Sequence, residues 1–236
     1  MILLIRVELL EKYDGGNNCF DLKRRFEALS GEPCLLLHHT QVTTGLLGTL
    51  KPRAVVLSGF GTSFAEFDLG TFRPLDDLVK QSDIPVLALC GSHQLLAHLY
   101  NHDIGRVKAL PDEPMRRLRP GEPDLGSDGY FREQGFYPVR IVKDDPLFDG
   151  VSNPFVVRQA HYCEVKTLPE GFELLASTDA CKVQAMKHRT RPVYGTQFHP
   201  EAYVERYPDG RTIVLNFFRI AGILQPERPH SPPHQG

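Results

Sequence analysis

A cysteine stands at the end of a buried apolar run near the middle of the chain. Residues 86–89 are Val-Leu-Ala-Leu and predict a buried strand, which leads into Cys90, Gly91 and Ser92 and then into a helix that includes residues 95–100. The two small residues allow the sharp strand-to-helix turn of a nucleophile elbow. There the helix N-terminus stabilises negative charge on the sulfur, and the Gly91 N–H is placed to bind an oxyanion. The structural alternative is a buried core cysteine, because free cysteine is among the most buried residue types.

A histidine and a carboxylate end a second strand-like segment. Residues 193–197 predict a strand, and His199-Pro200-Glu201 follows it. Side chains two residues apart lie on the same side of an extended chain, so Glu201 is placed to accept the Nδ1 proton of His199. The Nε2 atom then stays available to take a thiol proton, which is the chemistry of a cysteine–histidine hydrolase. By itself, a histidine at a strand end is more often structural; beside a cysteine elbow the catalytic interpretation is favoured.

A third turn follows the β-branched run at residues 54–57. Ser58, Gly59, Phe60 and Gly61 come directly after it. One interpretation is an ordinary loop between a strand and a helix. The functional interpretation is a second backbone N–H donor, near Gly59 or Phe60, that completes an oxyanion hole with Gly91.

These segments together resemble the signatures of class I glutamine amidotransferase domains. The resemblance covers roughly residues 40–220, and its motifs occur in the family's order. The matching segments are Leu57-Ser58-Gly59, Cys90-Gly91-Ser92-His93-Gln94, Glu133-Gln134-Gly135, Gln159-Ala160-His161-Tyr162 and Gln197-Phe198-His199-Pro200-Glu201.

The resemblance implies a role for each matching residue. Cys90 attacks the side-chain amide of glutamine, His199 passes a proton to the departing ammonia, and Glu201 orients His199. Water then hydrolyses the γ-glutamyl thioester. Backbone N–H groups of Gly59 and Gly91 hold the oxyanion, Gln94 helps to bind the substrate, and His161 borders the substrate pocket. His93 is expected to be a structural helix residue.

Two positions depart from the family pattern, and both concern the substrate side. Ser92 stands where glycine is usual, so we expect it to narrow the pocket or to offer a hydroxyl to the substrate. Cys163 stands where an aspartate is common.

Hydrophobic periodicity predicts one α/β domain over residues 1–224. Buried strands alternate with helical segments in the first half, which indicates βαβ units, and residues 137–197 are β-rich. With the resemblance, the expected fold is a doubly wound, mostly parallel, flavodoxin-like sheet flanked by helices, and a final helix at 212–223. A proline- and glycine-rich stretch, 110–129, predicts a long loop whose three arginines (116, 117 and 119) are interpreted as solvated. The proline-rich tail, 225–236, is expected to be disordered.

Composition narrows the function further. The 236 residues are 41% hydrophobic and carry a formal net charge of −2, which gives no reason to expect a nucleic acid or a membrane as partner. Five cysteines without a CxxC pair argue against both a disulfide framework and a zinc site, and favour a cytoplasmic protein with reduced thiols. No metal and no cofactor are expected.

Three functions stay open at this point. The first is a glutaminase that delivers ammonia to a separate synthase or synthetase chain. The second is a stand-alone hydrolase that uses the same three residues on γ-glutamyl peptides or amides. The third is a catalytically silent interaction protein that keeps the fold, which the intact cysteine, histidine and glutamate disfavour.

Overall fold

Nine strands form one mixed sheet in the computed structural model, which describes residues 1–13 and 19–225. Within those residues the strand order is β2-β1-β3-β4-β9-β8-β7-β5-β6. The strands are β1 (Ile2–Arg6), β2 (Cys34–His38), β3 (Ala54–Leu57), β4 (Val86–Leu89), β5 (Glu133–Ile141), β6 (Phe155–His161), β7 (Phe172–Ser177), β8 (Ala185–His188) and β9 (Val193–Thr196).

The sheet is parallel in one half and antiparallel in the other. Strands β2, β1, β3, β4 and β9 pair in parallel. The remaining pairings, from β9 through β8, β7 and β5 to β6, are antiparallel. The α/β class and the β-rich C-terminal half agree with the sequence, but the sheet is mixed rather than mostly parallel. The parallel strands are apolar on both faces because helices cover both.

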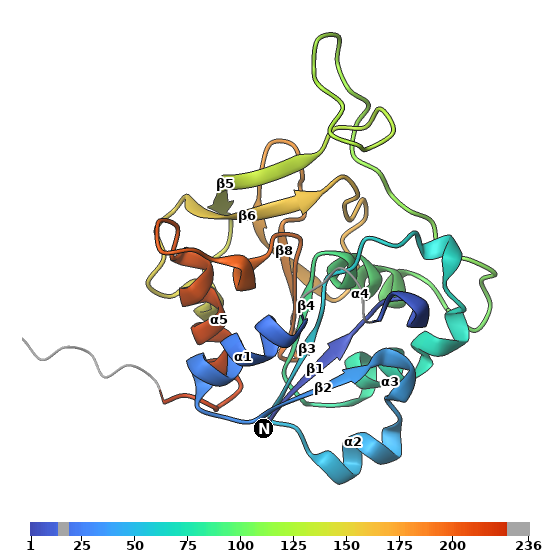
Figure 1. The fold of residues 1–236 in the computed structure, drawn as a ribbon, viewed down its shortest axis with the longest axis vertical. Coiled ribbons are helices and arrows are strands. Elements are labelled where there is room, and N and C mark those ends of the chain that lie inside the picture. Colours follow the sequence, from blue (N-terminus) through green and yellow to red (C-terminus); the bar gives the residue numbers. More distant parts are fainter. Residues whose placement is uncertain (14–18, 226–236) are drawn as a thin grey trace, which may run out of the picture.

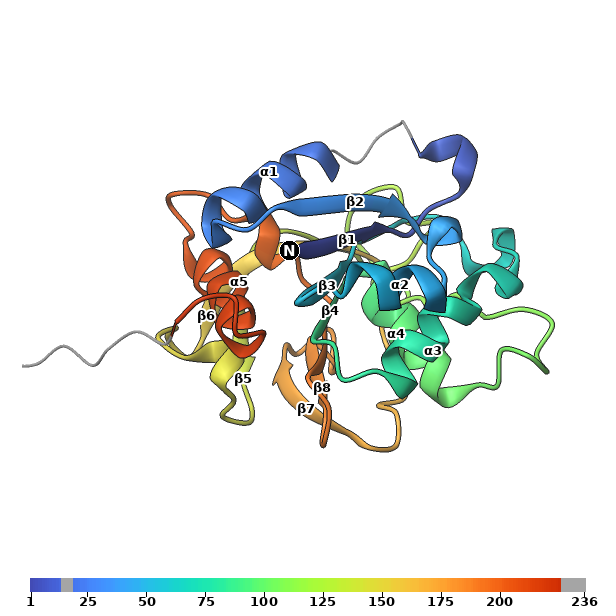
Figure 2. The same ribbon diagram turned by 90° about the horizontal axis from the view of Figure 1, so that it is seen from below.

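Helices cover the parallel half of the sheet on both faces (Figures 1 and 2). Helices α1 and α5 pack over one apolar cluster, which includes Phe26 and Phe217, and α2, α3 and α4 pack over the other, which includes Leu75 and Leu95. The helices are α1 (Cys19–Ser30), α2 (Thr44–Leu50), α3 (Arg73–Gln81), α4 (Gly91–Asn101) and α5 (Asp209–Ile220). Short 3-10 turns are η1 (Leu10–Lys12), η2 (His39–Gln41), η3 (Phe64–Glu66), η4 (Leu69–Phe72), η5 (Pro146–Phe148) and η6 (Pro200–Ala202). No helix of the described residues is long and apolar enough to cross a membrane.

The long loop predicted at residues 110–129 is an ordered projection. It carries isolated β-bridges, of which one joins Pro114 to Cys163 and another joins Arg117 to Tyr130. Arg116 forms a two-pronged ion pair with Glu122, at 2.7 and 2.8 Å. Figure 1 shows the segment rising from the edge of β5. The sequence therefore predicts that this segment is a loop, but it does not predict the β-bridges and the ion pair that hold the loop in place.

Two further points separate the sequence from the structure. Helix α2 was not expected, because its two glycines weaken the helical pattern; the Thr43 side chain caps it by accepting the Leu46 N–H. The division at residue 224 and the disordered tail stay predictions, because residues 226–236 lie outside the described part of the chain.

Candidate active site

Three neighbouring parallel strands bring the predicted residues to one edge of the sheet. Strand β3 ends before Ser58 and Gly59, β4 ends before Cys90, and β9 ends shortly before His199. Because β3, β4 and β9 are adjacent and parallel, their carboxyl ends meet at the same edge. In open α/β sheets this is the edge at which ligands bind.

Cys90 occupies the strand-to-helix turn in a strained conformation. Its backbone has φ of +48° and ψ of −108°, values that residues other than glycine rarely adopt. The Cys90 N–H donates to the Thr196 carbonyl at 2.7 Å, which attaches the turn to β9. The Cys90 side chain is buried but lines a cavity, described below. A strained, pinned cysteine of this kind is the geometry of a nucleophile elbow.

His199 and Glu201 form a largely buried pair. The His199 Nδ1 atom lies 2.7 Å from Glu201 Oε1, and the two side chains are 19% and 7% exposed. Burial by itself lowers the pKa of His199. The negative charges of Glu201 and Cys90, and hydrogen bonds with both, outweigh burial and raise this pKa well above its ordinary value. The pair therefore favours a protonated imidazole beside the Cys90 sulfur.

Gly59 lies between the nucleophile and the histidine. A Cβ atom at this position would be 3.0 Å from His199 Cε1 and 3.3 Å from Cys90 Cβ. The next residue, Phe60, packs against the elbow so closely that a Cβ on Gly91 would meet the Phe60 carbonyl oxygen at 2.5 Å. Both glycines are thus required by close approach, and the predicted oxyanion residues adjoin Cys90.

A cavity of about 190 Å³ opens beside the nucleophile, and we call it the Cys90 cavity. Its wall includes Phe60, Gln94 and His161, as the sequence predicts. It also includes two charged side chains, Asp112 and Arg132, that were not predicted. Asp112 accepts hydrogen bonds from Ser63 Oγ at 2.5 Å and from the Phe64 N–H at 2.9 Å, and keeps further acceptor capacity.

A chain of amide side chains connects helix α4 to the sulfur. Gln94 donates to Gln197 Oε1 at 3.1 Å, and Gln197 in turn donates to Cys90 Sγ at 3.6 Å. Gln94 also donates to the Cys163 carbonyl at 3.0 Å. Gln197 was not singled out from the sequence, although its position two residues before His199 places it on the same side of an extended chain.

His161 is fixed in the cavity wall by a buried polar network. Its Nε2 atom lies 2.9 Å from Glu133 Oε2, and its Nδ1 atom lies 2.9 Å from the Cys163 carbonyl oxygen. Glu133 also accepts from Gln184 at 2.7 Å and from Thr178 at 3.1 Å. With both ring nitrogens engaged, His161 shapes the wall and has a fixed orientation.

Ser92, His93 and Cys163 lie near the site and have buried or half-buried side chains. Ser92 is fully buried and its hydroxyl donates to the Ser58 carbonyl at 2.6 Å, so the expectation that it narrows the pocket or contacts the substrate is wrong. His93 is also fully buried; its Nε2 lies 3.0 Å from the Val183 carbonyl oxygen, and burial lowers its pKa to about 3. Cys163 lines the Cys90 cavity, and burial raises the pKa of its thiol to about 12.

Comparison with known proteins shows the family to which the chain belongs. The family model for class-I glutamine amidotransferases matches residues 22–221. The chain is 37% identical over 142 residues to a protein of Archaeoglobus fulgidus and 36% identical over 146 residues to one of Methanocaldococcus jannaschii, each named as one subunit of glutamine-hydrolyzing GMP synthase. These alignments cover 60% and 62% of this chain, and 64% and 65% of the relatives, which is less than two thirds of their length.

A solved structure shares the whole fold. It is a protein of Thermoplasma acidophilum described as one subunit of a GMP synthase, and it superposes with a TM-score of 0.69 at 25% identity, over 94% of both chains. The motif residues, the fold and the family match all point the same way, and the chain belongs to the class-I glutamine amidotransferase family.

Proposed function

We propose that this chain hydrolyses the side-chain amide of glutamine to glutamate and ammonia through a γ-glutamyl thioester on Cys90. The observation that carries the proposal is the meeting of Cys90, His199 and Glu201 beside the Cys90 cavity. The strand order β2-β1-β3-β4-β9 supports a binding site at this edge of the sheet. It matches the order 2-1-3-4-5 of flavodoxin-like sheets, which bind ligands at the carboxyl ends of their strands, and the three residues lie at or near those ends.

In the first half of the reaction, the Cys90 thiolate attacks the amide carbon. Backbone N–H groups at Gly59 and Gly91 stabilise the oxyanion of the tetrahedral intermediate. His199, whose pKa is raised, donates its proton to the nitrogen as the carbon–nitrogen bond breaks. Ammonia leaves, and the γ-glutamyl group stays on the sulfur as a thioester.

In the second half, water replaces the sulfur. The neutral His199 accepts a proton from water as the oxygen attacks the thioester carbon, and the intermediate collapses with the Cys90 thiolate as leaving group. Glutamate is released and His199 is again protonated. Glu201 keeps the imidazole oriented through both halves by its contact with Nδ1.

The Cys90 cavity favours a small amino acid as substrate. At about 190 Å³ it is smaller than the roughly 300 Å³ at which drug-sized ligand pockets begin. Asp112 and Arg132 give it one negative and one positive side chain, which complement the ammonium and the carboxylate of an α-amino acid. Free glutamine, with its amide toward Cys90, satisfies both requirements.

We further propose that the ammonia is delivered to a separate synthase chain. The support comes from the relatives, which are named as one subunit of a glutamine-hydrolyzing synthase.

A substrate comparison with the purified chain tests the proposal. Ammonia release from glutamine is measured beside amine release from γ-glutamyl peptides, for the wild type and for Cys90→Ala. We expect turnover of glutamine that Cys90→Ala abolishes, while Cys34→Ala, at a buried cysteine in β2, retains it. Turnover of the peptides with no release of ammonia from glutamine would instead establish a γ-glutamyl hydrolase.

A further inference from the structure

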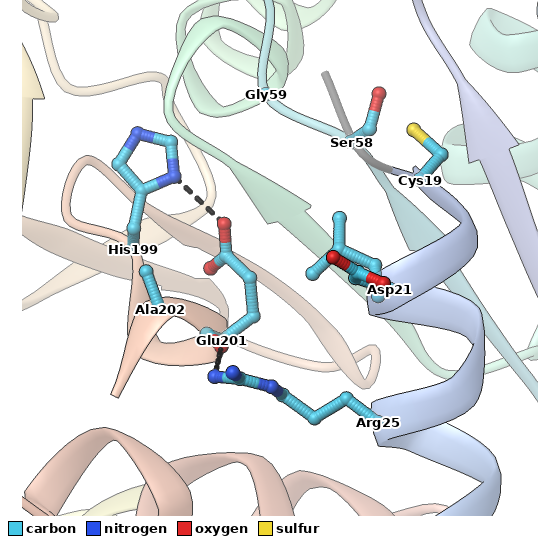
Figure 3. A pocket seen from close by; sticks show the side chains of 9 residues that line it. Cys19, Asp21, Arg25, Ser58, Gly59, His199, Glu201 and Ala202 are labelled. Carbon is cyan, nitrogen blue, oxygen red and sulfur yellow. Dashed lines mark hydrogen bonds and ion pairs between the residues drawn. The ribbon is translucent and has the colours of Figure 1, made fainter. Parts of the chain in front are cut away.

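A second cavity lies on the other side of the histidine–glutamate pair, against helix α1. We call it the α1 cavity; its volume is about 240 Å³, and its lining includes His199, Glu201 and Arg25. Figure 3 shows Glu201 between His199 on one side and Arg25, which extends from α1, on the other. None of the catalytic steps proposed above uses Arg25.

Arg25 holds the main chain around Glu201. Its Nη1 atom donates to the carbonyl oxygen of Glu201 in a short contact and to that of Tyr203 at 3.1 Å. Its guanidinium also lies 4.4 Å from the centre of the Tyr203 ring, a cation–π distance. The Arg25 side chain, from α1, therefore contacts the main-chain carbonyls on both sides of Ala202.

The Glu201 carboxylate has few contacts of its own. Oε1 contacts His199, whereas Oε2 is buried and has no hydrogen-bond partner in residues 1–13 and 19–225. Carboxylates that orient a catalytic histidine usually owe their position to further hydrogen bonds. For Glu201 the position of the carboxylate therefore depends on how firmly the main chain of the turn is held.

Other contacts hold the turn in the fold, so the loss of Arg25 need not unfold it. The His199 N–H donates to the Arg158 carbonyl at 2.8 Å. On the opposite side Gly210 packs against Pro200, at a distance where a Cβ would meet the Pro200 carbonyl oxygen at 2.4 Å. Arg25 adds the contact that lies directly at Glu201.

We propose that Arg25 is a positioning residue, which sets the Glu201 carboxylate against His199 by fixing the Glu201 and Tyr203 carbonyls. The inference rests on the proposed function for its kinetic readout, and it predicts a specific pattern. Arg25→Ala lets the carboxylate move, and a displacement of about 1 Å at a catalytic group costs on the order of 100-fold in rate. Since Arg25 does not line the Cys90 cavity, KM for glutamine stays within about twofold while kcat falls roughly 10- to 100-fold.

Matched variants separate positioning from charge. Arg24→Ala removes an arginine from the exposed side of the same helix, and we expect wild-type kinetics from it. Arg25→Lys keeps the charge, but its compact ammonium cannot both lie flat against the Tyr203 ring and reach the two carbonyls that the single Nη1 atom contacts, so we expect a loss close to that of Arg25→Ala. In a Glu201→Gln background Arg25→Ala should cause less additional loss than in the wild type, because Arg25 acts through Glu201.

A measurement without substrate keeps the inference separate from the function. NMR titration of labelled histidine should show the pKa of His199 lower in Arg25→Lys than in the wild type, because Glu201 is one of the charges that raise this pKa and the lysine keeps the positive charge of Arg25. An unchanged His199 titration, or an equal kinetic loss in Arg24→Ala, would overturn the positioning role. Absence of glutamine turnover in the wild type, together with the shifted titration, would instead refute the proposed function and leave the positioning role supported.

Discussion

Replacement of Gly59 by alanine tests the arrangement of the site directly. The added methyl group would stand 3.0 Å from His199 Cε1, 3.3 Å from Cys90 Cβ and 3.5 Å from the Leu89 carbonyl oxygen. Favourable contacts between carbon atoms begin at about 3.5 Å, so the imidazole must give way by a few tenths of an ångström. Cys90 and Leu89 belong to the pinned elbow and its strand, so His199 is the group that must move.

The size of the effect follows from that displacement. Since a displacement of about 1 Å costs on the order of 100-fold, a shift of a few tenths of an ångström at the histidine predicts a fall in kcat of roughly 3- to 10-fold. Overpacking of this kind costs about 1–3 kcal/mol of stability, which for a chain of this length lowers Tm by roughly 2–12 °C. The protein therefore stays folded at the assay temperature, and the loss is one of catalysis.

The assay is ammonia release from glutamine at saturating substrate, with Tm measured on the same samples. Gly48→Ala is the matched control, because it adds the same methyl group in helix α2, where nothing lies within 4 Å of the added Cβ. We expect Gly48→Ala to keep wild-type kcat. If folded Gly59→Ala turned over glutamine as fast as Gly48→Ala, Gly59 could not lie between the nucleophile and the histidine as described.

Two further predictions concern pH and stability. The first half of the reaction starts from a protonated His199, whose pKa Glu201 raises, so kcat/KM should persist above the ordinary histidine range and fall as pH rises through this raised pKa. Glu201→Gln should move that alkaline limb of kcat/KM to lower pH, and an unmoved limb would contradict the pairing. Glu133→Ala removes the carboxylate that His161, Thr178 and Gln184 contact. At no less than about 1 kcal/mol for each of the three, we expect Tm to fall by at least roughly 6–12 °C in a thermal scan, and to fall less in Glu133→Gln, which keeps the size and one acceptor oxygen.

The parallel half of the fold and the meeting of Gly59, Cys90 and His199 at one edge of the sheet could be predicted because both have local signals. Apolar runs ended by small or polar residues marked β3, β4 and β9, and Gly59, Cys90 and His199 each follow within three residues of a strand end. Because β3, β4 and β9 are parallel neighbours, these residues lie at the same edge of the sheet. The antiparallel pairing of β8, β7, β5 and β6 had no such signal, because the apolar pattern of a strand indicates neither its direction in the sheet nor the strand with which it pairs.

The charged residues of the Cys90 cavity could not be found from the sequence for a different reason. Asp112 and Arg132 lie 20 residues apart and share no motif with Cys90. Tertiary contacts, among them the bridge between Pro114 and Cys163, bring the intervening segment to the end of β6. Arg25 is a similar case, since its partner Glu201 is 176 positions away and the contact is with a main-chain carbonyl.

The ordered projection has a consequence for protein engineering. Asp112 lies at its beginning and Arg132 comes shortly after its end, while the part between them is held internally by contacts such as that of Arg116 with Glu122. Shortening the tip would therefore leave both charges in the cavity wall, whereas a deletion that reaches either base would remove one of the two charges that we propose bind the ends of an amino acid. The projection can therefore be shortened at its tip without removing Asp112 or Arg132, but it cannot be shortened at its base without losing one of them.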